Sequence, residues 1–203
     1  MNLPNLITLS RIPLMFIIAG LMYSERIGAA TAAFIFFIIA AFGDWLDGYL
    51  ARRHGLVTTF GKLMDALTDK IMVMGLVIAF VGSPEFATSP RREIAVAVAL
   101  ITLCREFLVT GMRMVAASKG VIVAADSGGK TKTITQLIAL GFLLGAPMVQ
   151  RDFGPFTGTD VAAFTRVVQR IGEYIFIFGT VLAIWSGWRY VRHFRSVVFG
   201  DPK

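Results

Sequence analysis

Long, nearly uncharged apolar segments separated by short polar connections make up most of this chain. Of its 203 residues, 16% are charged and 56% are hydrophobic, whereas soluble domains carry about 25% charged residues. A helix that crosses the hydrocarbon core of a bilayer needs roughly 20 residues and satisfies its own backbone polar groups. The composition therefore excludes an ordinary soluble domain and predicts an all-α integral membrane protein.

Six segments have the length and apolarity of membrane-spanning helices. We expect residues 1–203 to form a single membrane domain, with one polar loop around Ser127–Lys130 and a longer connection over residues 151–169. The six expected transmembrane helices lie at about residues 8–23, 28–48, 61–81, 94–117, 133–149 and 171–190.

The basic residues indicate how the chain sits in the membrane. The formal net charge is +7, and the lysines and arginines cluster at the ends of apolar segments. This distribution favours contact with anionic lipid headgroups over nucleic acid. With six spans, the larger share of the cations falls on the side that holds both termini, so the positive-inside rule predicts that both termini face the cytoplasm, across the cell's cytoplasmic membrane.

Four aspartates lie at the polar ends of the second and third segments, on that same cytoplasmic side. Ionised carboxylates at membrane depth are costly and usually serve a function. Within each segment the two aspartates are three or four residues apart, so each pair projects from one face of a helix. If the two helices are antiparallel neighbours, four carboxylates converge on one space: Asp44, Asp47, Asp65 and Asp69.

Like charges this close require counter-cations, because each carboxylate raises the pKa of its neighbours. Oxygen ligands without histidine or thiolate favour Mg²⁺ or Mn²⁺. Two such ions about 4 Å apart can clamp a phosphoryl group during in-line displacement, so a diphosphate is the natural substrate. Gly48 and Ala51 leave room for a ligand, and Arg52 offers a forked donor for phosphate oxygens.

The spacing across these two segments forms a longer pattern with no position substituted: Asp44-x-x-Asp47-Gly48-x-x-Ala51-Arg52, then residues 53–60, then Gly61-x-x-x-Asp65-x-x-x-Asp69. This pattern resembles the signature of the CDP-alcohol phosphotransferase family. The resemblance extends through further residues and is strongest to the members whose acceptor is glycerol 3-phosphate. These further residues are Pro4–Thr8, Arg11, Arg105–Phe107, Arg113 and Gly129–Thr133.

The resemblance implies a six-helix bundle, usually dimeric, with a polar cavity open to the cytoplasm. It implies transfer of a phosphatidyl group from CDP-diacylglycerol to glycerol 3-phosphate, with release of CMP. By the same resemblance Asp44, Asp47 and Asp65 coordinate two metal ions, and Asp69 is the general base while also contacting metal. A small-residue pair, Gly141 and Gly145, is compatible with a dimer face.

The resemblance also implies two substrate-binding groups of residues. The CDP site would be lined by Gly48, Ala51 and Arg52, with weaker contributions from Asn5 and Thr8. The acceptor's phosphate needs separate cations, for which the candidates are Arg105, Arg113, Lys130 and Lys132. Arg105 has an alternative structural interpretation, in which Glu106 or a neighbouring helix neutralises it.

Three other functions compete with this hypothesis. The same family contains enzymes with other acceptors, such as inositol phosphate, serine or phosphatidylglycerol. Intramembrane polyprenyl-diphosphate transferases also use paired aspartate-rich motifs, although their motifs lie on well-separated segments. A cation transporter would explain the membrane carboxylates but not the spacing of Gly48, Ala51 and Arg52.

Overall fold

A computed structural model describes residues 3–53, 59–83, 86, 91–121, 127–157 and 161–200. These residues form helices and connections and contain no strand, which confirms the all-α expectation. In chain order the elements are α1 (Leu3–Met22), α2 (Ala29–Arg53), α3 (Thr59–Val81), α5 (Arg92–Ser118), α6 (Ser127–Pro147), the π-helix η1 (Met148–Phe153), α7 (Gly154–Thr157) and α8 (Ala162–Phe199).

Four helical stretches of the described chain are long and apolar enough to cross a membrane, as expected of a membrane protein. Helix α2 adds a shorter apolar stretch, Ala29–Gly43, before its aspartates begin. Helix α3 carries its aspartates in its first half and is apolar only from Ile71. The four long stretches are Asn5–Met22, Arg92–Ser118, Thr131–Thr157 and Ala162–Arg195.

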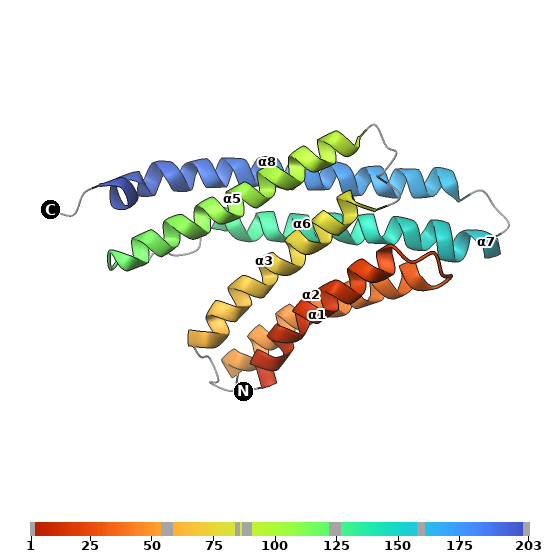
Figure 1. The fold of residues 1–203 in the computed structure, drawn as a ribbon, viewed down its shortest axis with the longest axis horizontal. Helices are drawn as coiled ribbons and strands as arrows, with labels where there is room; N and C mark the ends of the chain where they lie inside the picture. The colour runs from red at the N-terminus through yellow and green to blue at the C-terminus, as the bar shows by residue number, and fades with distance from the viewer. Residues whose placement is uncertain are drawn as a thin grey trace.

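The long helices alternate in direction along the bundle. Helices α6 and α8 lie side by side along the longest axis, α5 packs on α8, and α1 packs against both α2 and α3 (Figure 1). One end of the bundle holds the starts of α1, α3 and α6 and the ends of α2, α5 and α8; we call it the aspartate end. The other, which we call the opposite end, holds the connection between α1 and α2, together with η1 and α7.

Glycines permit the close approach of α6 and α8. A Cβ atom on Gly172 would lie 2.9 Å from Leu143 of α6, and one on Gly179 would lie 3.3 Å from Thr135. Gly141 and Gly145, in contrast, face Phe37 and Phe34 of α2, with Cβ separations of 3.7 and 3.6 Å. This small-residue pair is therefore used for packing within one chain, and it gives no support to a dimer face.

Two boundaries differ from the expectation. The sequence predicts a loop at Ser127–Lys130, but these residues form the first turn of α6. The first turn of a helix leaves its N–H groups without intrahelical partners, so two glycines disturb it little there. Helix α8 extends well beyond residues 171–190 at both ends, because arginines such as Arg166 and Arg170 occupy exposed positions and do not interrupt it.

At the opposite end, Asp152 of η1 holds the start of α2. Its Oδ1 accepts a hydrogen bond from the Gly28 N–H at 2.9 Å. Its Oδ2 accepts two, from the N–H and the hydroxyl of Thr31, at 2.7 and 2.6 Å. Gly28 has φ +87°, a conformation that favours glycine. A buried carboxylate thus caps α2 from a distant part of the sequence.

Candidate active site

The third helix presents two carboxylates to α1. Arg11 of α1 donates a hydrogen bond from Nη1 to Oδ1 of Asp69 at 2.5 Å, and its Nη2 lies 3.9 Å from Oδ1 of Asp65. The Arg11 side chain is 2% exposed, whereas those of Asp65 and Asp69 are 51% and 35% exposed. A buried guanidinium therefore supplies part of the positive charge that two neighbouring carboxylates require, while both remain accessible to a ligand.

Helix α1 also brings the motif of α2 close to this acidic pair. Ile7, one turn before Arg11, lies 3.7 Å from where a Cβ on Gly43 would stand, and Gly43 directly precedes Asp44. On the other side, Met15 packs so closely on Gly75 of α3 that its sulfur leaves no room for a Cβ atom there. Neighbouring turns of α1 thus contact both aspartate-bearing helices, which supports convergence of the two motifs.

The predicted metal ligands are described in part. Asp65 and Asp69 lie on one face of α3, as their spacing indicated. The backbones of Asp44 and Asp47 belong to α2, but their side chains lie outside the described residues. Among the side chains that the structure describes, no group of three or more histidines, cysteines or acids could hold a metal ion. Convergence of all four carboxylates on shared metal ions therefore stays a prediction.

The structure also describes only some of the side chains predicted to line the CDP site. Thr8 is 4% exposed and lies three residues before Arg11, on the same side of α1. Asn5 of α1 and Gly48 of α2 are half-buried. The side chains of Ala51 and Arg52 lie outside the described residues, although both backbones are part of α2.

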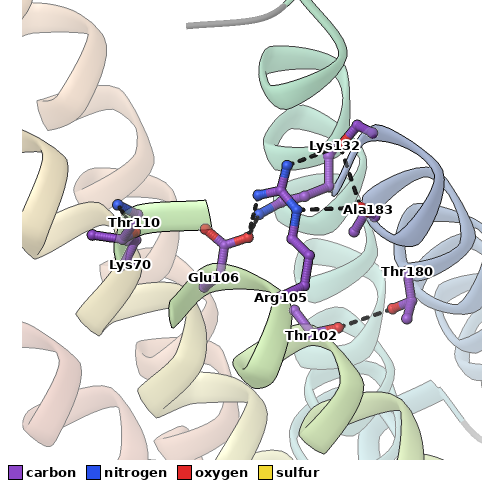
Figure 2. A network of polar contacts seen from close by, with 9 residues as sticks. Lys70, Thr102, Arg105, Glu106, Thr110, Lys132, Thr180 and Ala183 are labelled. Carbon is purple, nitrogen blue, oxygen red and sulfur yellow. Dashed lines mark hydrogen bonds and ion pairs between the residues drawn. The ribbon is translucent and has the colours of Figure 1, made fainter. Parts of the chain in front are cut away.

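Three of the predicted acceptor-site cations lie on α5 and α6 at the aspartate end. Nη1 of Arg105 donates to Oε1 of Glu106 at 2.7 Å, and Nζ of Lys132 donates to the same oxygen (Figure 2). Arg113, two turns further along α5, stacks over the ring of Tyr190 at 5.5 Å. The side chain of Lys130 lies outside the described residues, while its backbone belongs to α6.

Arg105 is also bound to α8. Its Nε donates to the carbonyl of Ala183 at 3.2 Å, and its Nη2 donates to the hydroxyl of Ser186 at 2.8 Å. These contacts show that Arg105 joins α5 to α8. Its bond to Glu106 agrees with the alternative interpretation, in which Arg105 is a structural cation neutralised by Glu106. Because Lys132 is 4% exposed and bonds to Glu106, the same carboxylate also joins α5 to α6.

Sequence reasoning missed Lys70. Its Nζ donates to the hydroxyl of Thr110 on α5 at 2.9 Å (Figure 2), and it lies within electrostatic range of Glu106, Arg105 and Arg113. The signal in the sequence was its position directly after Asp69, which turns it about 100° away from the acidic face. We call Arg105, Glu106 and Lys132 the Glu106 cluster. Helix α3 thus carries an acidic face toward α1 and a cation toward this cluster.

Comparison with known proteins identifies the family. The model of the CDP-alcohol phosphatidyltransferase family matches residues 1–185. The chain belongs to this family. Its membership decides against a cation transporter and a polyprenyl-diphosphate transferase, and it makes the protein a transferase.

Relatives of similar length carry one enzyme name. The chain is 39% identical over 203 residues to the CDP-diacylglycerol–glycerol-3-phosphate 3-phosphatidyltransferase of Bacillus subtilis, covering 93% of each chain. It is 31% identical over 192 residues to the enzyme of that name from Rickettsia bellii, covering 94% of each. An Arabidopsis thaliana relative, numbered 2 under the same name, is 35% identical over 203 residues, covering 97% of this chain and 81% of its own.

Proposed function

We propose that this protein transfers a phosphatidyl group from CDP-diacylglycerol to glycerol 3-phosphate, giving phosphatidylglycerol phosphate and CMP. The family match and the names of relatives at 31 to 39% identity support this reaction. Both the donor and the acceptor carry phosphate, so the enzyme needs one charged site for a diphosphate and another for a phosphate monoester.

The observation that carries the proposal is the position of α3 between two charged groups. Asp65 and Asp69 face α1 and Arg11, while Lys70 reaches α5 beside the Glu106 cluster. Because Asp69 and Lys70 are consecutive, a reaction centre at the acidic pair adjoins a cation-rich site on the next helix. Adjacent sites of this kind hold the two phosphorylated substrates close together, which favours transfer between them.

The residues present fit a divalent metal site. Asp65 and Asp69 supply hard oxygen atoms one helical turn apart and remain accessible, which suits Mg²⁺ or Mn²⁺. Asp44 and Asp47 would complete the ligand set for two ions. When bound, the ions would offset the negative charge of the diphosphate and of the departing CMP.

Asp69 is the proposed general base. Arg11 contacts its Oδ1 and orients the carboxylate. The carboxylate accepts the proton of the attacking hydroxyl of glycerol 3-phosphate as the oxygen bonds to the lipid-side phosphorus. The bond from that phosphorus to the oxygen of CMP breaks, and CMP departs with the electron pair. The departing phosphate needs no proton, because CMP is stable as an anion at neutral pH.

The remaining site residues bind the two substrates. Gly48, Ala51 and Arg52, with Asn5 and Thr8, line the CDP site. The acceptor's phosphate is bound by the cations already named for it, and we add Lys70 because it bonds to Thr110 on α5. The full set is Arg105, Arg113, Lys130, Lys132 and Lys70. Glu106 bonds to both Arg105 and Lys132, so it compensates part of their charge within the membrane when no acceptor is present.

The placement of the enzyme follows from the sequence pattern. We propose one domain over residues 1–203 with six transmembrane helices, in which α2 and α3 also cross the bilayer. The aspartate end, its polar cavity and both termini face the cytoplasm, in the cytoplasmic membrane. The protein acts as a homodimer, as the family resemblance implies.

The direct test is a product assay with purified protein. CDP-diacylglycerol and Mg²⁺ are incubated with glycerol 3-phosphate, inositol phosphate, serine or phosphatidylglycerol, and the lipid product is identified by mass spectrometry. We expect phosphatidylglycerol phosphate with glycerol 3-phosphate and little product with the others. A dominant product from another acceptor would keep the family chemistry but reject the proposed acceptor. CMP release with phosphatidate as the lipid product would indicate hydrolysis and reject the transfer.

A further inference from the structure

A cavity of about 620 Å³ lies at the opposite end of the bundle, far from the acidic pair. It is lined by the last turns of α3, the first turns of α5, the second half of α6 and residues 170–177 of α8. Its nearest lining residue on α3, Val77, is eight residues beyond Asp69, or roughly 12 Å along the helix. The cavity is therefore separate from the proposed reaction centre.

The cavity has a buried floor and an exposed rim. Val77, Leu140 and Phe86 are 4%, 1% and 1% exposed, while Ile94 and Tyr174 at the rim are 54% and 70% exposed. Apolar walls of this kind lose van der Waals contacts when nothing fills the space between them. In a bilayer, the apolar material next to such an opening is a lipid acyl chain.

Charged residues gather at one end of this cavity. Arg91 directly precedes α5, and Arg170 and Glu173 lie in the early turns of α8. Helices α5 and α8 run in the same direction, since Arg91 pairs with Glu173 and Arg105 with Ser186 further along. Apolar lining residues follow at Val98 and Phe176, roughly 10 Å deeper along α5 and α8. The cavity lining is thus polar at the end of the bundle and apolar toward the membrane interior. This order matches a phospholipid, which has a polar headgroup followed by apolar acyl chains.

The charges of Arg91, Arg170 and Glu173 indicate which lipid headgroup would fit the cavity. Nη1 of Arg91 bonds to Oε2 of Glu173 at 2.5 Å, and the exposed Arg170 adds a second cation, so the three residues carry one net positive charge. A phosphodiester carries one negative charge and balances them. Oε1 of Glu173 is buried and accepts no hydrogen bond of ordinary length from the described residues, although the side chain of Gln169 lies close to the same carboxylate. A hydroxyl on the headgroup can donate to this oxygen.

We propose that this cavity binds a phospholipid whose head carries one net negative charge and free hydroxyl groups. The phosphodiester is placed at Arg170 and Arg91, a headgroup hydroxyl at Glu173, and one acyl chain between α3, α5, α6 and α8. A zwitterionic lipid would add an ammonium beside two arginines and is disfavoured. The inference depends on the cavity alone and not on the reaction proposed at the aspartate end.

Photochemical cross-linking with a matched pair of variants tests this site. The full-length protein is reconstituted in phosphatidylcholine vesicles that contain a trace of phosphatidylglycerol or phosphatidylcholine with a diazirine on one acyl chain. Cross-linked peptides are mapped by mass spectrometry. We expect the anionic probe to label residues 77–98 and 170–177 at least about tenfold more than the zwitterionic probe, the lower end of what one charge-assisted hydrogen bond gives.

Arg170→Gln should remove most of this preference, while Arg166→Gln should leave it within about twofold of the wild type. Both arginines are exposed on α8 one turn apart, but only Arg170 lines the cavity. A second variant, Val98→Trp, fills the cavity with an indole and should lower labelling by both probes. CMP release, expected to stay near the wild-type rate, shows that each variant is folded and separates this test from that of the reaction.

Four results would overturn the proposal. One is equal labelling by the two probes, and another is labelling elsewhere on the chain. A third is an equal response to Arg170→Gln and Arg166→Gln. The last is loss of labelling by both probes at the same residues as the protein-to-lipid ratio rises, which would show that a second copy of the chain occupies the cavity.

Discussion

Two sets of carboxylates lie in the helices of this protein, and their surroundings differ. Asp152 is 6% exposed, and the start of α2 donates three hydrogen bonds to its two oxygens. Asp65 and Asp69 have side chains that are 51% and 35% exposed, and Arg11 binds them on one side. The first carboxylate is satisfied within the fold, whereas the other two retain accessible surface at the end of the bundle.

The difference shows how a functional acid in a membrane helix is distinguished from a structural one. A carboxylate in a membrane helix indicates function when it stays accessible, and structure when the hydrogen-bonding capacity of its oxygens is met within the fold. Asp152 meets that capacity by capping a helix, where the carboxylate also interacts favourably with the helix dipole. Asp65 and Asp69 lie side by side with like charge, an arrangement that is stable only with further cations. Metal removal and substitution of Asp69 and Asp152 test this distinction, and substitution of Arg113 tests the neighbouring acceptor site.

Removal of divalent metal should lower the reaction rate more than any substitution. It should act through Asp65 and Asp69 and leave the Asp152 cap unaffected. We expect EDTA to lower the rate of CMP release by more than about 10³-fold. The reason is that the metal ions stabilise the charge that develops in the transition state by several kcal/mol. Added Mg²⁺ or Mn²⁺ should restore the rate. EDTA that is already saturated with Mg²⁺ serves as the control. Full activity in chelator would reject the metal site at Asp65 and Asp69.

Asp69→Asn should lower kcat by about 10² to 10⁴, the usual contribution of a general base. The amide oxygen can still accept a hydrogen bond from buried Arg11, so the variant should elute as a folded protein in size-exclusion chromatography. Asp152→Asn is the matched control, since it makes the same substitution in a carboxylate that is already satisfied. Substantial turnover by Asp69→Asn would remove this residue from the role of base.

Arg113→Ala should raise the KM for glycerol 3-phosphate about tenfold, because one charge-assisted hydrogen bond to its phosphate is lost. The KM for CDP-diacylglycerol should change less. Arg189→Ala is a close control, because Arg189 also stacks on an aromatic ring of α8, that of Trp185 at 4.7 Å. Steady-state kinetics with each substrate varied in turn separates the two constants. Equal increases for both substrates would assign Arg113 to packing on Tyr190 instead of to acceptor binding.

Asp152→Asn should have the smallest effect on catalysis and act on stability. An amide has one acceptor oxygen where the carboxylate has two, so one or more donors at the start of α2 lose their partner. We expect a destabilisation of about 1 to 3 kcal/mol, seen as a lower Tm in detergent, with kcat of the folded protein unchanged. A large loss of kcat at an unchanged Tm would mean that Asp152 acts in the reaction and is not a purely structural carboxylate.

Much of the fold and part of the candidate site could be predicted from the sequence. Apolar run lengths predicted helices at the observed places, and the i, i+4 spacing of Asp65 and Asp69 placed both on one face of α3. Boundaries were less predictable where polar residues continue a helix, as at Ser127–Lys130. The partner of Asp152 could not be predicted, because Gly28 and Thr31 are more than 120 residues away in the chain.

The sequence by itself determined that this chain is helical, belongs in a membrane and carries the motif of its family, because these properties depend on composition and local spacing. Tertiary structure alone decided that Arg11 meets Asp69, that Lys70 reaches the Glu106 cluster, and that Asp152 is a helix cap. Such contacts depend on which helices pack together and at what register. That choice is made by the summed packing of whole helices and is not encoded by any residue's near neighbours.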